Sequence, residues 1–267
     1  MHHTNPHTFI RFHLINYRQA VADCIDTLLE KGIIRRSTSE FRAPCVPVPK
    51  PDGSVRFCVD FRALNKVTKP DNYQLPRIDH IKTSINGKIF SAIDLKDGFY
   101  QIPIDKKTIP LTAVAVGTGT YEYLRMPFGL RNAPPVFQRF MDSVCHKLRN
   151  TLVYIDDVIV WADTVQEHME YIRSFLERAS EYGLTINWRK SHFFQLEIRY
   201  LGFDFDRNGC KPKKEVKPKI MDFPVPHDKR SVLKFMGIVN YYRNHIMALA
   251  QAAMPLYDLQ KAYVRFK

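Results

Sequence analysis

The chain has 267 residues, of which 45% are hydrophobic and 25% charged, proportions that are ordinary for a globular protein and exclude an intrinsically disordered one. Its 40 lysines and arginines outnumber its 27 aspartates and glutamates, which gives a formal net charge of +13. This excess favours a polyanionic partner such as a nucleic acid, although a solvated basic surface without such a role has the same composition. Five cysteines without a close pair exclude a disulfide scaffold or a zinc ribbon. The sequence has no run of about 18 apolar residues, so we predict no membrane span.

The first predicted elements are a helix and a hairpin. Apolar residues recur at helical spacing near the start of the chain, and Gly32 stands where the C-cap of a helix belongs. Two strand-like segments follow at 45–48 and 55–59, and the Lys-Pro-Asp-Gly sequence between them predicts a tight turn. The resulting hairpin carries one basic residue on each arm, Lys50 and Arg56.

The middle of the chain predicts two helices and three strands. Segment 78–85 predicts a short helix, and segment 88–95 predicts a strand that contains Asp94 near its end. Asn132 is placed to cap a helix whose first turn tolerates two prolines. Segment 152–161 is apolar on both sides of a pair of aspartates and predicts two strands joined by a turn. The apolar stripe of the second helix consists of Val136, Phe137, Phe140, Met141, Val144 and Leu148.

The last third of the chain predicts helices together with short strands. Thr164 and Glu167 form a capping box in front of a helix that ends at Gly183. Strands and turns then alternate as far as Gly209, a lysine-rich stretch follows, and Asp228 begins the last predicted helix. This order predicts an α+β fold in which helices lie on an antiparallel sheet.

The pair Asp156-Asp157 is the strongest chemical signal in the sequence. Two acids in the middle of an apolar strand pair would strongly destabilise the fold if they were buried and unpaired. A tight hairpin turn resolves this conflict, because it lifts both carboxylates to one end of the sheet, where Mg²⁺ finds the oxygen ligands that it prefers. A solvent-exposed turn without a metal is the alternative, since Asp is common in turns.

A second acidic strand strengthens the metal interpretation. Asp94 stands at the end of an apolar segment. If that strand neighbours the hairpin, three carboxylates surround a pair of metal ions about 3.5–4 Å apart, which suits in-line phosphoryl transfer. Asp97 lies in the loop that follows, where we expect a solvated or capping residue.

Taken together, these motifs resemble the reverse transcriptase family, and more narrowly the polymerase of Ty3/Gypsy-type retrotransposons. The similarity runs from about residue 28 to residue 257 and includes Met-Pro-Phe-Gly-Leu at 126–130 and Tyr-Ile-Asp-Asp at 154–157. Many motifs in the family's order are stronger evidence than one pair of aspartates. The other matching segments are 28–34, 56–65, 75–79, 93–95, 131–133, 200–202 and 237–243.

The resemblance implies a right-hand polymerase fold of fingers, palm and thumb, with an antiparallel palm sheet backed by helices. We expect fingers and palm at 21–205 and a thumb-like region at 206–267, whereas residues 1–20 match the family poorly and an RNase H segment is absent. The implied activity is that of an RNA-directed DNA polymerase, a nucleotidyltransferase that extends a primer with dNTPs on an RNA or DNA template. The implied cofactors are two Mg²⁺ ions, with Mn²⁺ as a substitute.

The resemblance also assigns roles to single residues. The expected catalytic residues and metal ligands are Asp94, Asp156 and Asp157. The expected nucleotide pocket, with the basic residues on the triphosphate and Phe99 beneath the sugar, consists of Lys50, Arg56, Phe99, Phe128 and Gly129. The residues expected to contact template or primer are Arg62, Gln138, Tyr154, Tyr200, Leu201 and Gly202.

Two alternatives to an active polymerase stay open at this point. The family usually carries a run of lysines around Lys50, and the sequence also departs from its pattern at 110–113 and 116–120. These departures favour a catalytically inactive retroelement remnant that only binds nucleic acid. A two-metal nuclease is the second alternative, because it needs the carboxylates but has no use for Phe99 or the hairpin.

The expected surroundings of the chain follow from the same resemblance. We expect no membrane, and an intracellular location in the cytoplasm, in a retroelement particle or in the nucleus. The RNase H and integrase parts of a larger polyprotein are expected partners.

Overall fold

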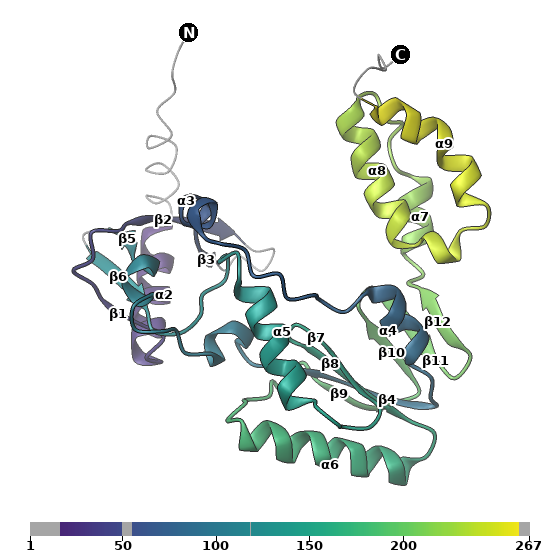
Figure 1. Cartoon of the computed structure of the whole chain (residues 1–267), viewed down its shortest axis with the longest axis horizontal. Coiled ribbons are helices and arrows are strands. Elements are labelled where there is room, and N and C mark those ends of the chain that lie inside the picture. Colours follow the sequence, from purple (N-terminus) through teal and green to yellow (C-terminus); the bar gives the residue numbers. More distant parts are fainter. Residues whose placement is uncertain (1–16, 50–54, 118, 262–267) are drawn as a thin grey trace. The chain divides into compact units, whose positions relative to one another are not determined.

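The computed structural model describes residues 17–49, 55–117 and 119–261, and Figure 1 labels its helices and strands. The chain divides into two compact units, each built from three separate stretches of sequence. Unit 1 comprises residues 1–76, 93–158 and 172–191, and unit 2 comprises residues 77–92, 159–171 and 192–267. The boundaries that we expected after residues 20 and 205 remain predictions.

Unit 1 begins with helix α2 (Arg18–Glu30), which ends where the sequence predicts. Gly32 adopts a left-handed conformation with φ +63°, which a glycine reaches without steric cost. The helix is followed by a five-stranded sheet with the order β1-β6-β5-β2-β3. Its strands are β1 (Ile34–Arg36), β2 (Ala43–Pro49), β3 (Val55–Val59), β5 (Val114–Val116) and β6 (Gly119–Tyr123).

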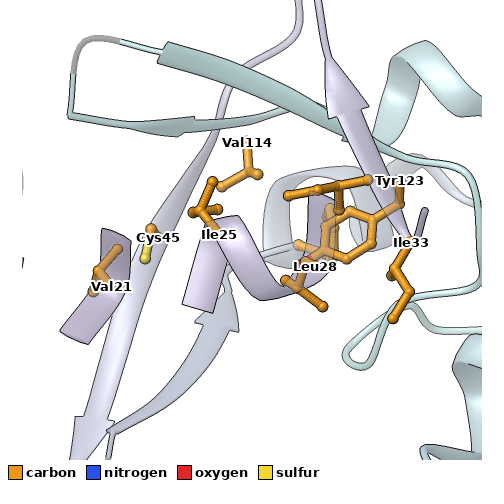
Figure 2. Close-up of a cluster of buried hydrophobic side chains, with 9 residues drawn as sticks. Val21, Ile25, Leu28, Ile33, Cys45, Val114 and Tyr123 are labelled. Atoms are coloured by element: carbon orange, nitrogen blue, oxygen red, sulfur yellow. The ribbon is translucent and has the colours of Figure 1, made fainter. Parts of the chain in front are cut away.

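The apolar face of α2 and the strands of this sheet share one core (Figure 2). Val21, Ile25 and Leu28 are three or four residues apart, so they lie on one face of the helix and are buried together. They pack with Cys45 and Tyr123 from the strands. Burial of each large apolar side chain contributes about 1.5–3 kcal/mol, which fixes α2 to the sheet.

The predicted hairpin is present, with β2 antiparallel to β3 and Val48 opposite Arg56. Its turn, which contains Lys50, lies outside the described residues. On its other side β2 runs parallel to β5, with Ala43 opposite Val114, so this sheet is mixed rather than purely antiparallel.

Helix α5 (Ala133–Val144) starts at the two predicted prolines, but our expectation that the side chain of Asn132 caps it is wrong. The Asn132 amide donates to the Lys69 carbonyl at 2.9 Å and accepts from the Asp71 N–H at 3.0 Å. The side chain therefore fastens segment 69–71 to the start of α5. The other helices of unit 1 are α3 (Arg62–Val67) and the 3-10 helices η1 (Gly98–Gln101) and η2 (Ile109–Thr112).

A four-stranded sheet with the order β7-β8-β4-β9 carries the acidic segments. Most residues of β4 and β8 are buried, which explains why their sequences are almost continuously apolar. Helix α6 (Val165–Glu181) opens with the predicted capping box, in which Thr164 and Glu167 exchange hydrogen bonds between side chain and backbone. The boundary between the units passes through β4, β8 and α6. The strands are β4 (Ile89–Asp94), β7 (Thr151–Tyr154), β8 (Asp157–Ala162) and β9 (His192–Gln195).

Unit 2 contains a three-stranded antiparallel sheet with the order β10-β11-β12, which follows β9 in the chain. Asp228 caps α8 (Lys229–Tyr241) through a capping box with Ser231, as the sequence predicts. The remaining helices are α4 (Ile78–Ser84), α7 (Val216–Met221) and α9 (Leu249–Gln260), and the strands are β10 (Glu197–Tyr200), β11 (Phe203–Asp206) and β12 (Gly209–Pro212).

The expectation that α8 is the last helix is wrong, because α9 follows it. Pro255 lies inside α9, where it removes one backbone donor, and this residue hid the helix from a reading of the sequence. Val232 and Met236 of α8 pack against Ala253 of α9.

The combination of helices and sheets in both units confirms the predicted α+β class. No helix in the described part of the chain is long and apolar enough to cross a bilayer.

Candidate active site

The hairpin β7–β8 presents its two acids at a two-residue turn, as the sequence predicts. Ile155 and Asp156 form the turn, and Asp157 is the first residue of β8. Ile155 has φ +58°, a left-handed conformation that glycine usually supplies and that is strained for a β-branched residue. The catalytic candidates therefore stand next to a backbone position that other contacts must stabilise.

Gln138 of α5 supplies such contacts. Its Oε1 accepts a hydrogen bond from the Ile155 N–H at 2.7 Å, and its Nε2 donates to the Val153 carbonyl at 3.2 Å. Nε2 also donates to Asp142 Oδ1 at 2.8 Å. The side chain is fully buried. We expected Gln138 to face the template, and this is wrong, because its amide is engaged inside unit 1 by the turn that precedes the acids.

The three predicted acids lie at the end of β4 and on the β7–β8 hairpin, and their charges act on one another within unit 1. Burial raises the pKa of Asp156, and the charge of Asp94 raises it further. Burial, followed by the charges of Asp156 and Asp94, raises the pKa of Asp157 to about 6. Asp94 ends β4, where its backbone N–H donates to Ser191 Oγ and its carbonyl accepts from the Asn187 N–H. The carboxylates thus lie close enough to repel one another.

Gly98 brings the loop after Asp94 against Asp156. A Cβ added to Gly98 would lie 3.3 Å from the Asp156 Cβ and 3.4 Å from its Oδ2, so any side chain here would require Asp156 to shift by a few tenths of an ångström. Asp97 is solvated and pairs with Lys31 at 3.2 Å, and it caps no helix through its side chain.

The acid cluster has the donor chemistry of a site for a hard cation. Carboxylate oxygens are the ligands that Mg²⁺ prefers, and a cation would relieve the repulsion that raises the pKa of Asp156 and Asp157. Within the described residues, no three His, Cys, Asp or Glu side chains already converge as a finished ligand set. The fit therefore rests on the chemistry and neighbourhood of the acids.

Phe99 lies between a buried ring and an exposed one. Its ring centroid is 5.3 Å from that of the fully buried Phe137 and 4.9 Å from that of Phe128, which is 49% exposed. Gly129 adopts φ +92°, and its carbonyl accepts a hydrogen bond from the Asn65 amide at 2.8 Å. Sequence reasoning missed Asn65, whose two bonds to the 129–131 segment depend on the fold. We refer to Phe99, Phe128 and Gly129 as the aromatic surface of unit 1.

The remaining candidates of unit 1 lie on its surface or at its strand ends. Arg62 is exposed and forks onto Asp60, which lowers the pKa of that carboxyl. Arg56 is exposed on β3, and Tyr154 is half-buried at the end of β7. Lys50 lies outside the described residues.

The three expected primer contacts of unit 2 are a buried tyrosine and the two residues of a turn. Tyr200 is buried and its ring contacts that of Phe205, and its expected role at the primer stays a prediction. Leu201 and Gly202 form the two-residue turn between β10 and β11. Their expected contact with the primer stays a prediction.

Asp157→Asn should stabilise the metal-free protein at pH 7.5. The folded-state pKa of Asp157, about 6, lies above its ordinary value of 3.8, so its ionisation destabilises the fold most fully above pH 6. As the pH falls through 6 towards 4, the folded protein takes up the proton first and the advantage of the variant disappears. Thermal unfolding with EDTA at pH 4, 6 and 7.5 measures this trend.

Asp97→Asn is the matched control, because Asp97 is an exposed partner of Lys31 and exposed pairs contribute little. A gain in melting temperature for Asp157→Asn that is equal at all three pH values would contradict the raised pKa of Asp157.

Comparisons with known proteins agree with this geometry. A family model described as "Reverse transcriptase (RNA-dependent DNA polymerase)" matches residues 48–205, more than half of the chain. The chain is 38% identical over 255 residues to the "Retrovirus-related Pol polyprotein from transposon opus" of Drosophila melanogaster, which covers 92% of this chain and 25% of the polyprotein. The chain therefore spans about a quarter of that relative.

Two solved structures are similar over most of the chain. The foamy viral protease-reverse transcriptase in complex with double-stranded DNA matches with a TM-score of 0.84 and 30% identity, over 90% of this chain and 43% of that chain. The same viral protein in complex with an RNA/DNA hybrid matches with a TM-score of 0.80 and 29% identity, over 92% of this chain and 33% of that chain.

Proposed function

The chain belongs to the reverse transcriptase family, and from this membership we propose that it extends a primer into DNA on an RNA or DNA template. The observation that carries the proposal is that Asp94 lies near enough to Asp156 and Asp157 in unit 1 for its charge to raise the pKa of both, with Gly98 packed against Asp156. The family predicted from the sequence motifs, the reverse transcriptases of LTR retrotransposon polyproteins, is confirmed.

Reverse transcriptases use divalent metal ions, and for this chain we infer two Mg²⁺ ions, replaceable by Mn²⁺. The residues that would hold them are Asp94, Asp156 and Asp157. When bound, such ions lower the pKa of the attacking hydroxyl and stabilise charge on the leaving pyrophosphate. The chain itself contributes three fixed carboxylates, two of which have raised pKa values and therefore a reason to accept positive charge.

The aromatic surface of Phe99, Phe128 and Gly129 is the proposed binding site of the incoming dNTP. Phe99 packs on a buried ring, so it offers a rigid surface to the sugar. Arg56 has the planar fork that suits a triphosphate, and Lys50 would add a point charge. Arg56 lies on β3, and Lys50 follows β2 in the sequence, outside the described residues.

Nucleic acid is the proposed partner of the +13 charge. The similar foamy viral protein is seen with double-stranded DNA and with an RNA/DNA hybrid, and both are duplexes that a polymerase of this kind handles. We propose that residues 21–205 act as fingers and palm and residues 206–267 as thumb. Arg62 and Tyr154 are the proposed template and primer contacts of unit 1.

The fate of a labelled primer tests the proposed function. An end-labelled DNA primer on an RNA template, with dNTPs and Mg²⁺, should grow when the purified chain is added. Shortening of the primer would support the nuclease. Binding without any change in primer length, in Mg²⁺ and in Mn²⁺, would support the inactive remnant.

Phe99→Val should relax the preference for dNTPs over rNTPs while it retains most dNTP incorporation. A 2′-hydroxyl pressed against the ring would lose its water and find no partner, which costs about 1–3 kcal/mol. The smaller side chain removes that penalty, so the ratio of kcat/KM for dNTP to kcat/KM for rNTP should fall by roughly tenfold.

The matched control is Phe140→Val on the same aromatic cluster. Phe140 is half-buried and contacts the Phe137 and Tyr182 rings, so its truncation should lower the melting temperature without changing the sugar preference. If Phe99→Val behaves in the same way, with an unchanged ratio, Phe99 serves packing alone.

A further inference from the structure

The turn between β10 and β11 has an unfavourable residue at its first position. Leu201 has φ +44° and Gly202 has φ +81°, so both residues of the two-residue loop are left-handed. Hairpin turns of this kind favour Asn-Gly or Gly-Gly, because most side chains clash there. A leucine at this position needs support from other parts of unit 2.

Tyr241, the last residue of α8, supplies this support. Its hydroxyl donates a hydrogen bond to the Leu201 carbonyl at 2.6 Å. Its ring stacks on Phe203, the first residue of β11, with centroids 5.5 Å apart and an angle of 24° between the planes. A Cβ on Gly202 would lie 3.4 Å from Tyr241 Cε1 and 3.4 Å from the Tyr242 hydroxyl, so the turn rests directly on the two tyrosines.

The end of α8 is itself held by charged contacts. Arg243 and Asn244, which follow the helix, both donate to the carboxylate of Asp79 on α4, at 2.9 and 3.0 Å. Lys82, one turn further along α4, pairs with Asp79 at 2.7 Å and places its ammonium 4.6 Å from the Phe203 ring centroid. Tyr241 therefore presents its hydroxyl from a fixed position within unit 2.

We propose that Tyr241 is a positioning residue for the primer, acting through the Leu201–Gly202 turn. This inference rests on the proposed function and on the predicted contact of Leu201 and Gly202 with the primer strand. The hydroxyl and ring of Tyr241 hold that backbone in its left-handed conformation before the primer arrives. The primer then binds without first having to order the turn.

Tyr241→Phe tests the inference, because it removes one oxygen and keeps the ring stacked on Phe203. The control is Tyr257→Phe, which removes a hydroxyl of α9 that donates to Asn240 Oδ1 at 2.8 Å. We expect Tyr241→Phe to raise the KM for primer–template about tenfold, with the KM for dNTP nearly unchanged. Its melting temperature should match that of the control.

A rescue variant separates positioning from general packing. Leu201→Asn creates the Asn-Gly pair that this turn prefers, so the turn no longer depends on the hydroxyl. The double variant Tyr241→Phe with Leu201→Asn should regain most of the lost affinity for primer–template.

Three results decide the inference. Equal KM values for primer–template in Tyr241→Phe and Tyr257→Phe would overturn it, as would a rise in the KM for dNTP of the same size. Failure of Leu201→Asn to restore primer use in the double variant would also overturn it. Failure of the proposed function is distinguishable, since the wild-type chain would then extend no primer at all.

Discussion

Asp156→Asn will abolish primer extension while it leaves the fold and duplex binding intact. The amide has the shape of the carboxylate, so the close contact with Gly98 is preserved. The change removes the negative charge that a divalent cation requires, and loss of one ligand should cost several kcal/mol of transition-state stabilisation. A rate lower by about a thousandfold or more in single-nucleotide incorporation is the expected result.

The control for this variant is Asp97→Asn, three residues after Asp94 in the chain. Asp97 is solvated and paired with Lys31, so its amide variant should extend primers at nearly the wild-type rate. Melting temperature and filter binding of a primer–template show whether each variant is folded and binds. Extension by Asp156→Asn at the rate of Asp97→Asn would show that Asp156 is not a metal ligand.

Gln138→Leu should lower kcat by roughly ten- to hundredfold and leave the KM for primer–template almost unchanged. Leucine has a similar volume but leaves the half-buried Ile155 N–H without its acceptor, at a cost of about 1–3 kcal/mol. The strained turn then loses the contact that fixes Asp156 and Asp157 relative to Asp94. We also expect a higher Mg²⁺ concentration at half-maximal rate, because the carboxylates are no longer held together.

Asn132→Leu provides a comparison for Gln138→Leu. This variant also removes an amide that binds backbone groups of another segment, but its partners are Lys69 and Asp71. It should lose stability without a change in the Mg²⁺ requirement. The role assigned to Gln138 is wrong if the two variants have the same kcat and the same dependence on Mg²⁺.

The sequence was sufficient for the elements whose signals are local. The apolar spacing before Gly32 predicts α2, and the apolar residues around Asp156-Asp157 predict a hairpin, because charged groups cannot remain inside a sheet. Two capping boxes, at Thr164 and Asp228, likewise predict the starts of α6 and α8. Each of these signals depends on neighbours within a few residues in the chain.

The features that the sequence did not predict depend on partners far away in the chain. The role of Gln138 is set by a turn 17 residues later, and the bond of Tyr241 is formed with a turn 40 residues earlier. No local pattern distinguishes a buried amide from one that faces a ligand. The same reason explains the wrong expectation for the side chain of Asn132.

The β7–β8 turn and the β10–β11 turn are stabilised in the same way. Ile155 and Leu201 are apolar residues at left-handed positions, where Gly or Asn is usual. Each turn is hydrogen-bonded to a side chain of a helix: the Ile155 N–H donates to Gln138 of α5, and the Leu201 carbonyl accepts from Tyr241 of α8. In both units an apolar residue at the tip of a hairpin is therefore combined with support from outside the hairpin.

Template-directed incorporation tests the central claim most directly. Four RNA templates that differ only in the base opposite the next position are each annealed to the same labelled DNA primer and offered one dNTP at a time with Mg²⁺. We predict that the wild-type chain adds the complementary nucleotide on each template, and that Asp156→Asn adds none. Addition that ignores the template base, or no addition by the wild-type chain on any of the four templates, would contradict the account.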